Sequence, residues 1–219
     1  MELYRSPDMA DETSAPQATR RQERRRELLD KARELFVTHG YEHTSLDMII
    51  AETGGSRRNI YELFGNKKTL FKAVMQDQID TILTKIQVPD PAADPRPIQQ
   101  QLEALGTAFL TGLMAPAALQ TMRQFVVYAS EWPELSREAY AAGPAILHAR
   151  LETYLTALAA KGDLVLADIP TAARILAEMF KGGLDLEALM THQYTVPHHK
   201  IEKQVRAAVD MFLNGTLPR

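Results

Sequence analysis

The chain has 219 residues with 25 basic and 28 acidic side chains, a formal net charge of −3, and no cysteine. The absence of thiols excludes disulfide scaffolds, thiolate zinc sites, iron–sulfur clusters and thiol nucleophiles. An apolar share of 45% is typical of globular proteins, and no apolar run approaches the roughly 18 residues of a membrane span or resembles a signal-peptide core. We therefore expect a cytoplasmic protein that does not enter a membrane.

The N-terminal third is locally basic. Residues 1–19 are polar and without periodicity, which predicts a disordered tail. From Arg20 to Lys72 there are 12 basic and 8 acidic residues, a net charge of +4, whereas the segment from Ala73 to Arg219 has a net charge of −4. A basic segment on an acidic protein suits a nucleic-acid contact, although charges that merely solvate helix surfaces would produce the same count.

A first helix comes directly after the tail. Its apolar residues recur on one face, and Gly40 is placed to end it in a left-handed cap. The RRQERRR run at residues 20–26 opens this helix. The run is compatible with an arm that touches DNA, or with ordinary i,i+4 ion pairs such as Arg26–Asp30 and Glu27–Lys31.

Residues 44–64 have the pattern of two short helices joined by a tight turn. Ser45 is suited to cap the first helix and Ser56 the second, and Gly54-Gly55 separate them. This pattern is typical of a helix-turn-helix, in which the second helix enters the major groove. An ordinary surface hairpin is the alternative, and it would make the chain a helical protein-interaction adaptor without DNA binding.

The second of these helices has side chains suited to DNA. Arginine can donate a fork to guanine, asparagine can pair with adenine, and a tyrosine hydroxyl can donate to phosphate. Lys67 stands at the start of the next helix, where a cation is favourable if a phosphate lies close by. The candidate DNA-binding residues are Ser45, Ser56, Arg57, Arg58, Asn59, Tyr61 and Lys67.

The rest of the chain is also predicted to be helical. A helix ending near Ile86 is followed by PDPAADPRP at residues 89–97, whose four prolines predict a linker. Several of the later helices have a proline near their start, and Pro133 is also compatible with the end of the preceding helix. The predicted helices span residues 98–114, 117–131, 134–141, 144–161, 170–191 and 197–213. No segment shows strand-like alternation, so we expect an all-α protein.

The segment SLDMIIAETGGSRRNIYELFGNKKTL, with its Tyr61-x-x-Phe64-x-x-Lys67-x-x-Leu70 run, resembles the DNA-binding region of TetR-family transcriptional regulators over about residues 22–75. The resemblance implies that Tyr61 and Lys67 hold phosphates, that Ser45 lies near the DNA backbone and that residues 57–59 read bases. Ile50 and Gly55 depart from the family's usual alanine and valine. Residues 125–135, 139–144 and 161–173 are similar to the AefR-like C-terminal type.

The resemblance implies three parts: a tail at residues 1–19, a helix-turn-helix DNA-binding domain at residues 20–66, and a helical regulatory and dimerisation body at residues 67–219. It implies a homodimer on a palindromic operator, released by a small-molecule effector, and repression more often than activation. We expect an apolar or aromatic effector, although large side chains at helical spacing are also typical of an ordinary hydrophobic core. The candidate ligand-binding residues are Phe109, Met122, Phe125, Tyr128, Trp132, Tyr154 and Phe180.

Two terminal apolar stripes are candidates for the dimer contact, with burial inside the monomer as the alternative. The candidate dimerisation residues are Ile175, Met179, Leu186, Ile201, Val205, Ala208 and Phe212.

An enzyme is the second class of function considered. The chain lacks a nucleophile elbow, a phosphate loop and a Glu-x-x-His pair. His192, His198 and His199 are interrupted by Pro197 and have no carboxylate at ligand spacing, so we expect no catalytic residues, no metal site and no cofactor.

Overall fold

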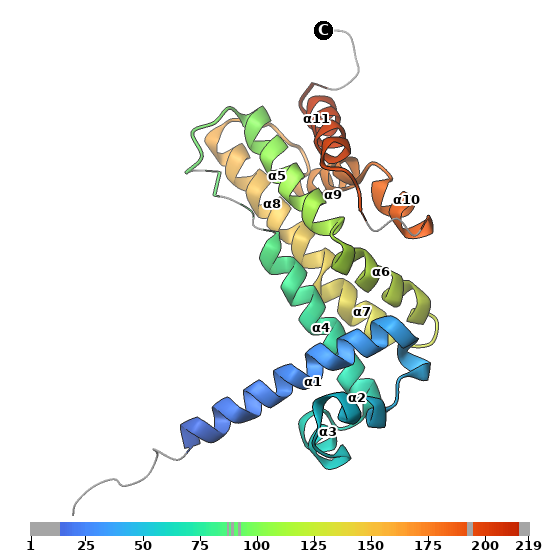
Figure 1. Ribbon diagram of the computed structural model, residues 1–219. Coiled ribbons are helices and arrows are strands. Elements are labelled where there is room, and N and C mark those ends of the chain that lie inside the picture. Colours follow the sequence, from blue (N-terminus) through green and yellow to red (C-terminus); the bar gives the residue numbers. More distant parts are fainter. Residues whose placement is uncertain (1–13, 87, 89, 92, 192–194, 215–219) are drawn as a thin grey trace, which may run out of the picture. The chain divides into compact units, whose positions relative to one another are not determined.

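The computed structural model describes residues 14–86, 88, 90–91, 93–191 and 195–214, and every regular element in these ranges is an α-helix (Figure 1). The all-α prediction is therefore confirmed. The chain divides into two compact units, residues Met1–Val74 and Met75–Arg219. The first unit holds α1 (Ser14–His43), α2 (Leu46–Thr53), α3 (Arg57–Phe64) and the start of α4 (Lys67–Lys85). The second holds the rest of α4 and α5 (Ile98–Leu113), α6 (Pro116–Tyr128), α7 (Pro133–Ala142), α8 (Pro144–Lys161), α9 (Ile169–Lys181), α10 (Leu184–Met190) and α11 (His198–Asn214).

Helix α1 differs from the expectation at both of its ends. It begins at Ser14, so only residues 1–13 of the predicted tail lie outside the described residues. Gly40 interrupts the helix with φ 77° and ψ 166°, a conformation that favours glycine, but a final turn runs on to His43. The buried Thr44 then donates its hydroxyl to the carbonyl oxygens of Gly40 at 2.7 Å and Leu35 at 3.1 Å, which satisfies carbonyls left free by the break.

An aromatic cluster holds the first unit together. Phe36 of α1 and Phe71 of α4 meet edge to face with ring centroids 5.1 Å apart, and the ring of Tyr41 packs on both. Because Phe71 and its neighbours Leu70 and Val74 belong to this core, the division between the two units falls inside α4 rather than before Lys67. The core is completed by Leu28, Leu29, Ala32, Ile49 and Ile60.

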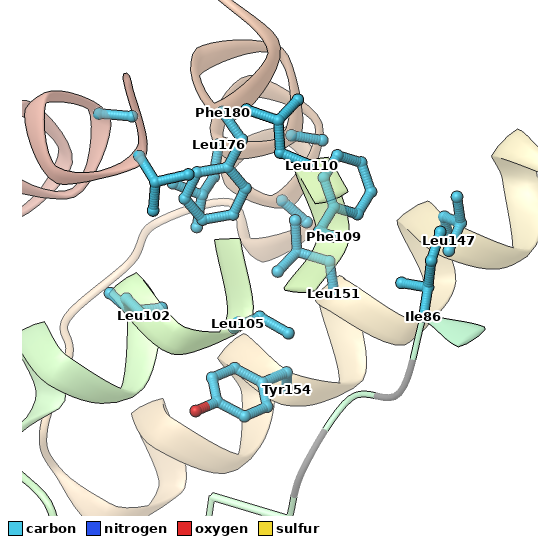
Figure 2. Packing of buried hydrophobic residues seen from close by; sticks show 14 of the residues in the cluster. Ile86, Leu102, Leu105, Phe109, Leu110, Leu147, Leu151, Tyr154, Leu176 and Phe180 are labelled. Atoms are coloured by element: carbon cyan, nitrogen blue, oxygen red, sulfur yellow. The ribbon is translucent and has the colours of Figure 1, made fainter. Parts of the chain in front are cut away.

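The second unit is a layered helical body around one large core (Figure 2). Helix α5 packs on α11, and α9 packs on both α8 and α11. Gly106 allows this close approach, because a Cβ there would lie 2.5 Å from the Phe180 ring and 2.7 Å from Val205. The labelled core side chains in Figure 2 include Leu102, Leu105, Phe109, Leu151, Tyr154, Leu176 and Phe180.

The single helix predicted over residues 170–191 is wrong. It is two helices, α9 and α10, separated by Gly182 and Gly183 with φ of 52° and 83°. Both glycines adopt the left-handed conformation that ends helices. The amide of Gln204 in α11 donates to the Met179 carbonyl oxygen at 2.6 Å and occupies the space that a Gly182 side chain would need. The apolar period continues across the break, and for that reason the pattern predicted one helix.

Helix α7 starts at Pro133, so this proline begins a helix and does not end the preceding one. The predicted linker contains no helix in its described residues before α5. Its end is held by Gln101, which donates to the carbonyl oxygens of Asp94 at 3.1 Å and Arg96 at 2.6 Å.

Within the described residues, no single helix has the length and hydropathy needed to cross a membrane. Helices α5 and α6 meet that test only when taken together, and they are bent by 61° where they join.

Candidate nucleic-acid interface

The first short helix of the predicted helix-turn-helix begins at a side-chain cap. The Ser45 hydroxyl accepts from the Met48 amide at 3.1 Å, while the Ser45 amide donates to the Met48 sulfur at 3.5 Å. The Ser45 side chain remains exposed, so α2 presents its N-terminus and Ser45 to solvent. This is the arrangement that a phosphate contact requires.

The turn between α2 and α3 is held by a residue of α1. Gly54 and Gly55 both have positive φ, 69° and 89°. The Arg24 guanidinium donates to the Thr53 carbonyl oxygen at 2.8 Å and to the Gly54 carbonyl oxygen, and it lies where a Gly55 side chain would project. Arg24 therefore fixes the turn, and the glycine at position 55 provides the space.

The RRQERRR run is thus largely engaged within the first unit. Arg24 also pairs with Glu27 at 2.5 Å, Arg25 lies 5.3 Å over the Phe64 ring, and Arg26 pairs with Asp30 at 3.1 Å. The Arg26–Asp30 pair is one of the two expected from the sequence. The role of Arg24 could not be predicted in the same way, because nothing in local spacing connects it to a turn about thirty residues later.

The Ser56 hydroxyl does not cap α3. Ser56 occupies the N-cap position, but its side chain makes no capping bond, and its hydroxyl donates instead to the Asn59 side-chain oxygen at 3.3 Å. Position alone is enough to start the helix here because Ser56 has the extended φ and ψ of an N-cap.

Helix α3 has a clear division between an inner and an outer face. Ile60 and Phe64 are buried. Arg57 and Tyr61 are exposed one turn apart on the outer face, with half of the Tyr61 side chain accessible. Arg58 is exposed and pairs with Glu62 at 2.7 Å, whereas Asn59 is half-buried against the turn. A short helix that buries two residues and exposes cations and a phenol is suited to binding in the major groove.

Arg57 is bound to an acidic residue of the preceding helix. Its Nε donates to Asp47 Oδ1 at 2.7 Å and its Nη2 donates to Asp47 Oδ2. This bond lowers the pKa of the Asp47 carboxyl and raises the pKa of Arg57. In the sequence Asp47 is only a first-turn acid of α2, so the pairing becomes visible only when α2 and α3 pack together.

Lys67 lies at the start of α4. Its ammonium group is 4.2 Å from the centre of the Tyr41 ring and donates to the Glu42 carbonyl oxygen at 3.3 Å. Both partners follow the Gly40 break, so Lys67 joins the end of α1 to the start of α4 while remaining partly accessible. Ser45 and Tyr61, the other predicted phosphate contacts, are exposed in the same unit.

The candidate ligand-binding residues differ in burial, and Met122, Phe125 and Tyr128 are partly exposed on α6. Phe109, Tyr154 and Phe180 are buried in the core, and the Tyr128 and Trp132 rings stack 5.0 Å apart. Two grooves of about 690 and 480 Å³ occur along the described residues of α5 and α11, and none of the seven candidates lines either. The larger groove is lined mainly by small and polar side chains.

The dimerisation candidates fall into three groups by burial. Ile201, Val205 and Ala208 are buried within the same chain, where their stripe packs on α5 and α9, the arrangement given above as the alternative to a dimer contact. Ile175 and Leu186 are exposed by 51% and 59%. Met179 and Phe212 are partly buried. Met190 and Met211 are further exposed apolar side chains on α10 and α11.

The histidines form no metal centre where the chain is described. His192 lies outside the described residues, and His198 is 3.3 Å from Glu202. In the described ranges no three His, Asp or Glu side chains gather in a way that could hold a metal ion.

Two protein-family models match the chain. Residues 28–74 match the model for bacterial regulatory proteins of the tetR family, and residues 100–215 match the C-terminal domain of AefR-like transcriptional repressors. The second match alone covers more than half of the chain.

Individual proteins resemble it over different lengths. The HTH-type transcriptional repressor ComR of Escherichia coli K12 is 46% identical over 57 residues, 26% of this chain and 27% of ComR. The chain thus spans about a quarter of that relative. A TetR-family regulator from Mesorhizobium loti has a crystal structure with a TM-score of 0.78 and 25% identity, covering 89% of this chain and 96% of that one. The flavonoid-responsive regulator FrrA has a TM-score of 0.76 at 23% identity, a likeness of fold, covering 90% and 99%.

Proposed function

The chain belongs to the TetR family of bacterial transcriptional regulators, and from that premise we propose that it is a ligand-responsive repressor that binds a palindromic operator as a homodimer. The observation that carries this proposal is helix α3, which buries Ile60 and Phe64 and leaves Arg57, Arg58 and Tyr61 exposed. Family membership places the chain among DNA-binding regulators, a class that is not enzymatic.

We assign the contacts by side-chain chemistry. Arg57, Arg58 and Asn59 read base edges, because α3 would enter the major groove by its N-terminal turn. Tyr61, Lys67, Ser45 and Ser56 bind or approach the phosphate backbone. The Asn59 side chain is half-buried, so its role requires it to turn away from Ser56 when DNA binds.

The dimer is proposed to form through exposed apolar side chains of the last three helices. Ile175, Leu186, Met190 and Met211 are all at least half exposed, and large apolar side chains of this kind favour burial at an interface. A twofold dimer would present two copies of α3, and its half-sites would be separated by about one helical turn, 34–36 Å.

The effector is proposed to be an apolar or aromatic small molecule. FrrA is named as flavonoid-responsive and shares this fold, and the seven candidate residues of the second unit are themselves aromatic or thioether side chains. Because Phe109, Tyr154 and Phe180 are buried in the core, we propose that the effector binds a conformation in which the helices that hold them move apart. Such a ligand induces release only if that conformation also misplaces α3.

Helix α4 is the proposed connection. Its first turns contribute Leu70 and Phe71 to the core of the first unit, and its later turns contribute Ile79 and Leu83 to the core of the second. A coupling free energy of about 1–3 kcal/mol carried by this helix would change DNA affinity roughly 5- to 150-fold.

Selection from random duplex DNA tests the proposal. We expect the purified protein to enrich a palindrome, and to bind it with an affinity that falls steeply as salt is raised. If folded, helical protein enriches no sequence at either of two salt concentrations, the helix-turn-helix would serve as a protein-interaction adaptor and the proposal would be wrong. An enriched operator then serves to screen flavonoids and other aromatic compounds for release.

A further inference from the structure

The Asp47–Arg57 pair is an exposed contact that joins α2 to α3. Both side chains are about 60% accessible, and Asp47 accepts from two different nitrogens of the Arg57 guanidinium, Nε and Nη2. Exposed ion pairs contribute little to folding stability. The pair therefore acts mainly on where the Arg57 guanidinium points.

The nitrogens used by Asp47 determine which donors stay available. A guanidinium has five N–H groups, and four of them form two forks: Nε–H with one hydrogen of Nη2, and one hydrogen of Nη1 with the second hydrogen of Nη2. Asp47 occupies the first fork. The second fork remains available, and it presents two parallel N–H groups along the axis of the side chain.

Two parallel donors match one base above the others. In the major groove guanine presents two acceptors, O6 and N7, side by side, whereas adenine presents one acceptor beside a donor. A guanidinium held by its Nε edge therefore fits guanine with its remaining edge. Both carboxylate oxygens of Asp47 are bound to Arg57, so in this arrangement the base contact is left to the guanidinium.

We propose that Asp47 is a specificity-determining positioning residue, which holds Arg57 so that its Nη1/Nη2 fork donates to the O6 and N7 of one guanine in each operator half-site. This inference rests on the proposed DNA-binding function and deepens it. Asp47 itself contacts no base. Its effect is to make binding depend on guanine at the position that Arg57 reaches.

A neighbouring ion pair provides the matched control. Arg58 on the same helix donates its Nε to Glu62 at 2.7 Å, a contact between residues one turn apart, and the Arg58 side chain is 86% exposed. Glu62→Gln removes the same unit of negative charge as Asp47→Asn and leaves the Asp47–Arg57 contact in place. Any effect of charge alone therefore appears in both variants.

The test is selection from random duplex DNA, followed by binding titrations on the selected operator and on operators with each base at the guanine position. The wild-type chain is expected to prefer guanine there by about 5- to 150-fold. Arg57→Ala removes the fork, and it should lose that preference. Asp47→Asn should lower the preference at least about fivefold, because binding to the substituted operators tightens more than binding to the guanine operator.

Glu62→Gln frees Arg58 rather than Arg57, so it should tighten binding to the operators that differ at the Arg57 position alike and leave the guanine preference at that position unchanged. A guanine preference that Asp47→Asn leaves intact would overturn this inference while the regulator function stands. The inference is also overturned, with the regulator function intact, if Arg57→Ala leaves the base preference unchanged at every position of the operator. If wild-type protein selects no sequence, the proposed function fails and this inference fails with it. Thermal unfolding of each variant, expected within a few degrees of wild type, shows that the fold is retained.

Discussion

Gly55, which has no side chain, leaves room for Arg24 beside the turn between α2 and α3. At φ 89° an L-residue is strained, and a Cβ would lie 2.7 Å from the Arg24 guanidinium and 3.3 Å from the Asn59 amide. Where the family usually has valine, this chain instead places an arginine from α1 against the turn. Arg24 supplies hydrogen bonds to the turn that a valine could not make.

A double-mutant cycle at Gly55 and Arg24 tests whether Arg24 stabilises the turn through the space that Gly55 leaves. Gly55→Ala should lower the free energy of unfolding by about 1–2 kcal/mol through the positive φ, and by about 1 kcal/mol more through displacement of the Arg24 bonds. In an Arg24→Ala background the cost of Gly55→Ala should fall by roughly 0.5–1.5 kcal/mol, measured by urea denaturation. Fully additive effects would mean that the two residues do not interact in solution.

Tyr61 carries a second prediction at the scale of a residue. Its side chain is half exposed on the outer face of α3, so Tyr61→Phe removes a hydroxyl without disturbing the core. We expect operator binding and non-specific binding to weaken alike, each by about 0.5–1.5 kcal/mol, because a phosphate contact carries no base information. Fluorescence anisotropy on both DNAs measures this. A loss confined to the operator would assign Tyr61 to base recognition.

At the scale of elements, a buried polar contact joins α4 to α6. The Thr121 hydroxyl lies 2.6 Å from Gln78 Oε1 and 2.8 Å from the Ala117 carbonyl oxygen, and both Thr121 and Gln78 are almost fully buried. A buried polar group without a partner is costly, so this contact specifies how the two helices pack. Because α4 also contributes Leu70 and Phe71 to the core of the first unit, this contact belongs to the helix that we propose as the connection.

Thr121→Val keeps the side-chain shape and removes the donor. It should lower the free energy of unfolding by about 1–3 kcal/mol, because Gln78 Oε1 is left without its bond in the interior. The control is Thr156→Val on α8, where an exposed hydroxyl donates to the Glu152 carbonyl oxygen at 2.8 Å; its cost should stay within about 0.5 kcal/mol. Equal costs in urea denaturation would show that the Thr121–Gln78 contact adds nothing.

For the whole molecule, the distribution of apolar side chains separates the monomer core from the proposed dimer surface. One side of α11 is used inside the chain, where Val205 and Val209 are buried in the core. Ile175 and Leu186 remain accessible on α9 and α10. Binding to a palindromic operator would require a dimer. Substitutions at these accessible residues are therefore expected to weaken the binding of α3 to DNA.

A double variant, Ile175→Glu with Leu186→Glu, should convert the proposed dimer to a monomer, because it places charges of the same sign from both protomers in an apolar interface. Sedimentation equilibrium should show the change in mass, and operator affinity should fall while helicity is kept. Val165→Glu is the control, since Val165 is 98% exposed between α8 and α9. A dimer that survives the double variant would place the interface elsewhere.

The sequence by itself was sufficient for the class of fold and for the helix-turn-helix. Those signals are local: Ser45 caps the helix that follows it, Gly54 and Gly55 interrupt the chain where they stand, and the apolar period marks the buried face of each helix. The same locality explains the error over residues 170–191, where the period ran on through Gly182 and Gly183. Local signals also placed Ser56 correctly at the N-cap of α3, but they could not show that its hydroxyl donates to Asn59 instead of capping the helix.

Only the tertiary structure decided which side chains meet across helices. Arg24 reaches a turn about thirty residues away, Asp47 binds Arg57 ten residues on, and the stripe containing Ile201 packs on α5 and α9 instead of facing outward. These contacts depend on the packing of surfaces that are distant in the chain. The physical reason is that helical periodicity tells which face of a helix is apolar, whereas the partner of that face is determined by the three-dimensional arrangement of all the helices.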